Sequence, residues 1–335
     1  MLADVLGQAE VAKKLINAWR KDRLAQAYIL HGPDGIGKTP FAIELAKTFL
    51  CLKGGTEHAL ADACDQCPSC RKVQHSNHED IEVLEPSGPG RVVTFENVNA
   101  LIEKLKFKTR SGEHRYVIIE EADRVRPETA NHFLKTLEEP PTDVTFFLLT
   151  ARLPALLETI VSRCQVVRMH RTPADAIERF LLARGAEPEK ARLYSRLADG
   201  CPGRAANMDG AGTFERRTRL LDWLHELDQT GDIVVASEVL EANRARTLMD
   251  TRDNHIANLG LLVTIYRDMT LLAEGADAAL LYNPDVADDL RSRAQRVGAA
   301  RLRTQSLEIL DARKNIEGMV SPDLVISQLL ADLAV

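Results

Sequence analysis

Residues 32–39 read Gly-Pro-Asp-Gly-Ile-Gly-Lys-Thr, and this stretch decides the fold. Its spacing, G-x-x-x-x-G-K-T, is that of a loop that binds phosphate groups. An apolar run at residues 27–31 precedes it, and residues 39–51 have helical periodicity, so the loop joins a buried strand to a helix. The alternative is a glycine-rich turn that happens to precede a lysine. The strand-loop-helix context favours the phosphate site.

The residues of this loop predict how a nucleotide would be held. Gly32, Gly35 and Gly37 allow a tight turn in which successive backbone N–H groups point at phosphate oxygens, at the positive end of the following helix. Lys38 is expected to reach the β and γ phosphates of ATP, and the Thr39 hydroxyl to bind Mg²⁺. The sequence therefore predicts ATP and Mg²⁺ as ligands.

The bulk composition is that of an ordinary soluble protein of 335 residues, with room for two or three domains. Its 43 Lys and Arg against 49 Asp and Glu give a net charge of −6, which argues against a chain that coats nucleic acid by itself. Residues 1–8 lack the features of a signal peptide, and no run reaches the roughly 18 apolar residues of a membrane span. We expect a cytoplasmic protein without membrane association.

Four of the six cysteines are closely spaced, as C-x12-C-x2-C-x2-C. They are Cys51, Cys64, Cys67 and Cys70. In a reducing compartment such spacing indicates tetrahedral zinc before it indicates disulfides. Four thiolates leave no open coordination position, so the predicted zinc is structural. A redox C-x-x-C pair and unrelated core cysteines are the alternatives.

Apolar strands alternate with helices up to about residue 171, and only helices follow. The expected strands are Ala27–His31, Ile81–Glu85, Tyr116–Glu120, Thr145–Thr150 and Gln165–Met169. The later helices include Ala174–Ala183, Lys190–Leu197, Arg216–Leu227 and Ile256–Leu272. The alternation predicts an α/β domain with a parallel sheet over residues 1–171. Glycine-rich breaks divide the helical remainder into a small domain, 172–211, and an all-helical domain, 212–335.

A second part of the phosphate site is predicted where the strand at 116–120 ends. The sequence Glu120-Glu121-Ala122-Asp123 delivers carboxylates there, of which one could hold Mg²⁺ while its neighbour polarises water. Glu120 stands where an aspartate is usual, and the longer side chain suits the strict octahedral geometry of Mg²⁺ less well. Because the residues could also be solvated acidic groups, ATP hydrolysis by this chain stays open.

Further stretches match a known family. They are Val5-Leu6-Gly7-Gln8, residues 127–141 ending in Leu-Glu-Glu-Pro-Pro, Ser162-Arg163-Cys164, and Gly200-Cys201-Pro202-Gly203-Arg204. With the phosphate loop and the four cysteines in the same order, residues 1–210 resemble the bacterial DNA polymerase III clamp-loader subunits of the AAA+ superfamily, and most closely the delta-prime group. The resemblance implies a P-loop NTPase domain with a zinc-binding module, a small helical lid and an all-helical collar domain. Residues 211–335 match only in length and helical character.

The resemblance also implies roles for residues outside the phosphate loop. Arg163 corresponds to an arginine finger that enters the ATP site of a neighbouring subunit and stabilises charge on the transferring phosphoryl group. Thr150 and Arg204 correspond to two sensors of the nucleotide, the second carried on the lid. Val5 and Gln8 lie in the segment that packs against adenine. Without the resemblance, Arg163 would be an ordinary surface arginine, and the sensors have equally plausible structural roles.

The implied function is that of a delta-prime subunit in a five-membered loader that opens a ring-shaped sliding clamp and closes it around primed DNA. Its implied partners are gamma/tau and delta subunits, the clamp and, through phosphates without sequence preference, DNA. No residue supplies polymerase chemistry. A gamma/tau-like ATP-hydrolysing motor is the first alternative, favoured by the complete phosphate loop and opposed by Glu120 and by the lack of a long carboxy-terminal tail. The others are a non-hydrolysing scaffold subunit and a lone AAA+ remodeller, which would have to explain both the cysteines and Ser162-Arg163-Cys164.

Overall fold

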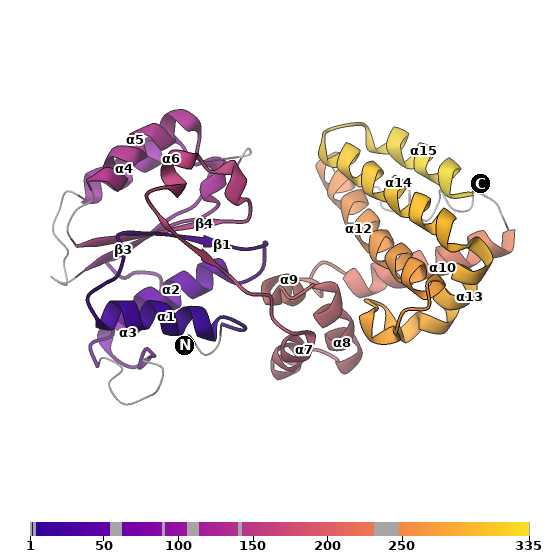
Figure 1. The fold of residues 1–335 in the computed structure, drawn as a ribbon, viewed down its shortest axis with the longest axis horizontal. Helices are drawn as coiled ribbons and strands as arrows, with labels where there is room; N and C mark the ends of the chain where they lie inside the picture. Colours follow the sequence, from indigo (N-terminus) through magenta and orange to yellow (C-terminus); the bar gives the residue numbers. More distant parts are fainter. Residues whose placement is uncertain are drawn as a thin grey trace. The chain divides into compact units, whose positions relative to one another are not determined.

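The computed structural model describes residues 2, 5–53, 62–88, 91–105, 114–139, 143–230 and 248–334. They form two compact units (Figure 1). The first unit comprises Met1–Ile177 and Asp199–Arg204, and the second comprises Glu178–Ala198 and Ala205–Val335. Pro140 and Pro141, which end the Leu-Glu-Glu-Pro-Pro stretch, lie outside the described residues. The division into three domains at residues 171 and 211 stays a prediction.

The first unit is built on a sheet of five parallel strands in the order β2-β3-β4-β1-β5 (Figure 1). The strands are β1 (Ala27–His31), β2 (Ile81–Leu84), β3 (Arg115–Ile119), β4 (Val144–Thr150) and β5 (Gln165–Arg168). The predicted parallel sheet is confirmed, and each strand boundary agrees within one residue. The phosphate loop follows β1, which lies between β4 and β5.

Helices cover both faces of this sheet (Figure 1). One face carries α1 (Ala9–Arg20) and α2 (Lys38–Phe49), and the other carries α4 (Phe95–Leu105), α5 (Pro127–Glu138) and α6 (Glu158–Val161). Successive strand side chains point to opposite faces. Tyr28 and Leu30 therefore join the core under α1 and α2, while Ala27 and Ile29 join the other core. A strand buried on both sides reads as a continuous apolar run, which explains why the sequence revealed these strands.

Because the strands are parallel, their carboxyl ends share one edge of the sheet. The phosphate loop, Glu120 and Thr150 lie at this carboxyl edge, after β1, after β3 and at the end of β4. Ligand sites of open α/β sheets form at such an edge. Arg163 precedes β5 and therefore lies at the opposite, amino edge.

The second unit is helical, as predicted for the carboxy-terminal region. Its helices are α8 (Pro188–Leu197), α10 (Thr213–Thr230), α12 (Leu248–Ala273), α13 (Ala287–Val297), α14 (Ala299–Glu317) and α15 (Pro322–Ala334). Two further helices, α7 (Ala174–Ala183) and α9 (Pro202–Asn207), contain two of the three boundaries between the units, and the third follows α8.

Helix α12 is the central helix of the second unit and packs against α10, α13 and α14. Among the described residues, it alone contains a stretch long and apolar enough to cross a membrane by length and composition. Leu262, Ile265 and Met269 on this helix are fully buried, and so is Asp268, whose carboxylate accepts hydrogen bonds from Asn283. These contacts identify α12 as the core helix of a helical bundle.

Candidate functional site

The phosphate loop has the backbone conformation that its glycines permit. Gly35 and Gly37 have φ angles of 79° and 100°, in the left-handed region that favours glycine. Gly37 is also the N-cap of α2, so the first N–H groups of this helix face the loop. A Cβ atom on Gly35 would lie only 2.7 Å from the backbone nitrogen of Arg204. Residue 35 must therefore be a glycine for this packing to form.

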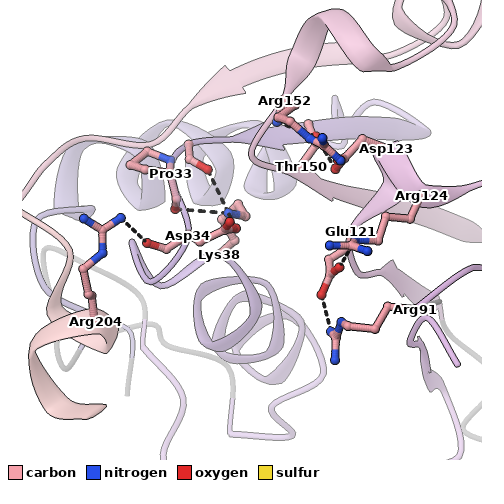
Figure 2. A network of polar contacts seen from close by, with 11 residues as sticks. Pro33, Asp34, Lys38, Arg91, Glu121, Asp123, Arg124, Thr150, Arg152 and Arg204 are labelled. Carbon is pink, nitrogen blue, oxygen red and sulfur yellow. Dashed lines mark hydrogen bonds and ion pairs between the residues drawn. The ribbon is translucent and has the colours of Figure 1, made fainter. Parts of the chain in front are cut away.

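Lys38 closes the loop on itself (Figure 2). Its Nζ donates to the carbonyl oxygens of Gly32 at 2.8 Å and Pro33 at 3.1 Å, and lies 3.4 Å from a carboxylate oxygen of Asp34. The two shorter contacts are to uncharged carbonyl groups, which are weaker partners for an ammonium group than charged oxygens are. Thr39, in the first turn of α2, is half-buried beside it.

The segment around Arg204 packs on the same loop. The backbone N–H of Gly203 donates to the carbonyl oxygen of Gly35 at 2.8 Å, and Arg204 Nη2 donates to that of Asp34 at 3.5 Å (Figure 2). The predicted second sensor therefore lies at the phosphate loop, and both belong to the first unit.

The amino-terminal segment also reaches this place. Val5 lies next to Gly37, since its Cγ1 is 3.6 Å from where a Cβ of that glycine would be. Gln8 is buried, and its amide exchanges two hydrogen bonds with the backbone of His170, of 2.6 and 3.0 Å. Gln8 thus fastens the segment to the chain after β5, a contact that the sequence did not suggest.

Two arginines hold the carboxylate of Glu121 (Figure 2). One oxygen pairs with Arg91, and the other lies 2.5 Å from Nε of Arg124. A carboxylate that polarises water needs an oxygen free to accept a proton. Glu121 is committed to ion pairs here, whereas Glu120 is half-buried at the end of β3 and its backbone N–H donates to Leu84 on β2.

Thr150 belongs to a buried polar network with Asp123, a residue that sequence reasoning did not select. The Thr150 hydroxyl donates to Asp123 Oδ1 at 2.7 Å and accepts from the Arg152 backbone N–H at 2.9 Å. The other Asp123 oxygen lies 2.8 Å from Nη2 of Arg152. Burial raises the pKa of Asp123, but the hydrogen bonds from Thr150 and Arg152 outweigh it and hold this pKa below its usual value. The only sequence signal was the position of Asp123 just after β3, the neighbour of β4.

Arg163 lies away from the phosphate loop. Its Nη2 is 2.5 Å from Glu138 Oε1 and its Nη1 donates to the carbonyl oxygen of Thr159 at 2.9 Å. The side chain is 36% exposed and borders a cavity of about 260 Å³ at the amino edge of the sheet. The four residues of β5, at about 3.3 Å each, separate this edge from the carboxyl edge. Arg163 is therefore outside the chain's own phosphate site.

The four cysteines come together as predicted. Their sulfur atoms all lie within 4.8 Å of one another, and Cys64 Sγ is 4.0 Å from Cys70 Sγ. Zinc–sulfur bonds of 2.3 Å in a tetrahedron require sulfur atoms about 3.8 Å apart, so the cluster fits zinc. Backbone N–H groups donate to three of the sulfurs, those of Cys51, Cys64 and Cys67, at 3.3–3.5 Å.

The surroundings of Cys64 favour the thiolate form of its side chain. The backbone N–H of Gln66 is the main cause that lowers the pKa of Cys64 to about 6, whereas burial raises that of Cys70. The thiolate is the form that binds metal. Cys67 also caps α3 (Pro68–Gln74), which anchors this side of the cluster.

A phosphate loop after β1, carboxylates after β3 and a helical carboxy-terminal region define an AAA+ P-loop protein. Two family models match the chain. The model described as DNA polymerase III, delta subunit, matches residues 7–173, and that described as DNA polymerase III, delta subunit, C terminal, matches residues 212–334. The chain belongs to the DNA polymerase III delta-prime family.

Individual relatives have similar names. DNA polymerase III subunit delta' of Bacillus subtilis is 28% identical over 317 residues, which cover 94% of this chain and 92% of that protein. The delta' subunit of Pseudomonas aeruginosa is 32% identical over 206 residues, 61% of each chain. DNA polymerase III subunit tau of Salmonella typhimurium is 30% identical over 262 residues, 73% of this chain and 39% of tau. The second family match extends the relationship to the carboxy-terminal helices, which the sequence motifs did not reach.

Proposed function

We propose that this chain is the delta-prime subunit of a bacterial clamp loader and that it supplies Arg163 to the ATP site of an adjacent subunit. The position of Arg163 carries this proposal. It is exposed at the amino edge of the sheet, with the length of β5 between it and the chain's own phosphate loop. An arginine in that place can serve only a nucleotide bound elsewhere, and arginine fingers supplied in trans are an established way to complete an ATP site.

The chain itself binds ATP and Mg²⁺ at residues 32–39, and the four cysteines hold a structural zinc. Lys38 and Thr39 contact phosphates and Mg²⁺, and Thr150 and Arg204 respond to the nucleotide. The packing of Gly203 and Arg204 on the loop supports such a response, since phosphates entering the loop would disturb these contacts. The packing of Val5 beside Gly37 supports a role for its segment in packing against the base.

The partners follow from the relatives, which are named delta' and tau subunits of DNA polymerase III. In this proposal the chain assembles in the cytoplasm with gamma/tau and delta subunits through residues 212–335. The loader then closes a sliding clamp around primed DNA, with contacts to DNA phosphates rather than to bases. The chain contributes no polymerase chemistry.

Hydrolysis of ATP by this chain itself is the point on which a second candidate differs. The complete phosphate loop and the 30% identity to tau favour a gamma/tau-like motor. The two arginines on Glu121, and a glutamate in place of aspartate at position 120, favour binding without turnover. Titration of the isolated chain with ATP, followed by a phosphate-release assay, separates the two. Binding without release supports delta-prime, and steady turnover supports the motor.

The proposal is tested by reconstituting the loader from this chain and the gamma/tau and delta subunits of the same organism, with clamp and primed DNA. Arg163→Ala should lower the ATPase rate and clamp loading of the complex while leaving the ATP affinity of the isolated chain unchanged. The matched control is Arg23→Ala, which removes an exposed arginine from the segment that leads into β1 at the same edge. An Arg163→Ala complex with the wild-type ATPase rate would rule out the trans role.

A further inference from the structure

Lys47 is a buried lysine that the proposed nucleotide site does not use. Its side chain is only 2% exposed, although it lies in α2, the helix that begins at the phosphate loop. Lysine is almost never buried to this extent unless it is paired, because a buried ammonium group without partners is costly. Its partners therefore indicate why it is there.

Two carboxylates surround the Lys47 ammonium. Nζ lies 2.6 Å from Glu44 Oε2, one turn earlier in the same helix, and 2.7 Å from Asp65 Oδ1. Burial lowers the pKa of Lys47, but the two carboxylates outweigh it and raise this pKa above its usual value, so the lysine stays charged. The pair with Glu44 is local, whereas the pair with Asp65 crosses to another segment.

That segment, residues 64–67, carries two of the four cysteines. Asp65 lies between Cys64 and Cys67, with a φ angle of 54° that turns the chain sharply there. On the other side, Cys51 follows Lys47 by four residues and lies two residues beyond the end of α2. The Lys47–Asp65 pair thus joins the helix that leads to Cys51 to the loop that carries Cys64 and Cys67.

The cluster depends on contacts between two segments, because 12 residues separate Cys51 from Cys64. The backbone N–H of Cys64 donates to the sulfur of Cys51 at 3.4 Å, a weak hydrogen bond between the two segments. Breaking a buried ion pair is costly, because removing one partner leaves an uncompensated charge in the protein interior.

We propose that Lys47 is a positioning residue for the metal site. Its ion pair with Asp65 holds the loop of Cys64 and Cys67 against α2, which keeps the four sulfur atoms at the spacing that tetrahedral zinc requires. This inference rests on the zinc site of the proposed function. It implies that Cys51 and Lys47 both connect the carboxy-terminal end of α2 to the segment that carries the other cysteines.

The test measures zinc release from the full-length chain to a chromogenic chelator, below the unfolding temperature. Lys47→Met shortens the side chain by one atom and removes its charge. It should release zinc roughly 10–100-fold faster than wild type, the usual effect of removing a residue that orients metal ligands. Asp65→Asn should act in the same direction, and the double variant should be no faster than the faster single, because both single variants break the same Lys47–Asp65 pair.

The matched control is Lys72→Met. It breaks the exposed pair of Lys72, on the same helix as Cys70, with Glu79 at 2.8 Å, and should leave the release rate unchanged. If Lys47→Met fails to fold, Asp65→Asn takes its place in the same assay. Release at the wild-type rate from folded Lys47→Met, or equal acceleration by Lys72→Met, would overturn the role of Lys47. A wild-type chain that binds no zinc would overturn the metal site and this inference with it, without bearing on Arg163.

Discussion

At the scale of single residues, Glu121 and Asp123 after β3 are paired with arginines, of which Arg91 and Arg152 come from distant parts of the chain. Glu121 is held by Arg91 and Arg124, and Asp123 by Arg152 together with the Thr150 hydroxyl. The oxygens of a carboxylate in such a pair are engaged and are not free to polarise a water molecule. Glu121 and Asp123 are therefore engaged in ion pairs within the chain, which agrees with the proposal of a chain that binds ATP more readily than it hydrolyses it.

The Asp123 network makes a prediction about pH. Because the pKa of Asp123 is lowered in the folded chain, its ionised form stabilises the fold above the unfolded pKa of about 3.9. That contribution is lost as pH falls through the lower, folded value. Asp123→Asn should destabilise the first unit by about 1.5–3 kcal/mol at pH 7, the range for hydrogen bonds to charged groups, and by progressively less below about pH 4.

Thermal unfolding of both proteins between pH 7 and pH 3 checks this expectation. Asp288→Asn is the control, because Asp288 is 94% exposed and its pair with Arg291 is open to solvent. A difference between Asp123→Asn and wild type that stayed constant with pH would contradict the assigned charge state.

At the scale of elements, the phosphate loop is positioned by the segment of Gly203 and Arg204. The two meet closely: Gly203 donates to the carbonyl oxygen of Gly35, and Gly35 has no room for a side chain. A loop packed this tightly cannot accept phosphates without some adjustment of the segment beside it. In the proposed function, this contact offers a route from a nucleotide in the loop to α9, the helix that begins at Pro202.

Substitution of Gly35 tests this contact. In Gly35→Ala the new Cβ would meet the Arg204 backbone nitrogen at 2.7 Å and the φ angle of 79° would be strained. Gly88→Ala is the matched control, with a φ angle of 73° and nothing within 4 Å of the added atom. Both variants bear the backbone cost of about 1–2 kcal/mol.

Gly35→Ala should be destabilised by a further ~1–3 kcal/mol from overpacking, and it should also lose ATP affinity. Denaturant unfolding and ATP titration of the two variants measure the difference. Equal stability and equal ATP affinity would show that the contact is loose in solution.

How far the sequence predicts this molecule also differs between elements and residues. Strands buried on both faces read as continuous apolar runs, so the sheet, the phosphate loop and the cysteine cluster followed from local patterns. The ion pairs Arg91–Glu121 and Lys47–Asp65 join residues that are 30 and 18 positions apart. Their charged side chains have no periodic pattern in the sequence. Such pairs depend on which segments the fold brings together, and no local signal distinguishes them from solvated charges.

At the scale of the whole molecule, the second unit leaves apolar side chains uncovered. Leu307 and Leu310 are 63% and 44% exposed on α14, at a spacing that puts them on one helix face, and Leu324 on α15 is 68% exposed. Large exposed apolar side chains that cluster mark interaction surfaces. This is the unit that, in the proposed function, joins the chain to the other loader subunits.

The double variant Leu307→Glu, Leu310→Glu tests that assignment. Because both side chains are exposed in the isolated chain, its stability should change by no more than about 0.5 kcal/mol. Burial of one leucine at an interface is worth about 1.5–3 kcal/mol, so association with gamma/tau should weaken at least ~10-fold if either is buried there. Analytical ultracentrifugation of the mixed subunits measures this.

Leu280→Glu, at a position 59% exposed outside α14 and α15, serves as control. Unchanged assembly of the double variant would place the contact surface on another face of the second unit, and equal weakening by Leu280→Glu would mean that added charge alone disturbs association.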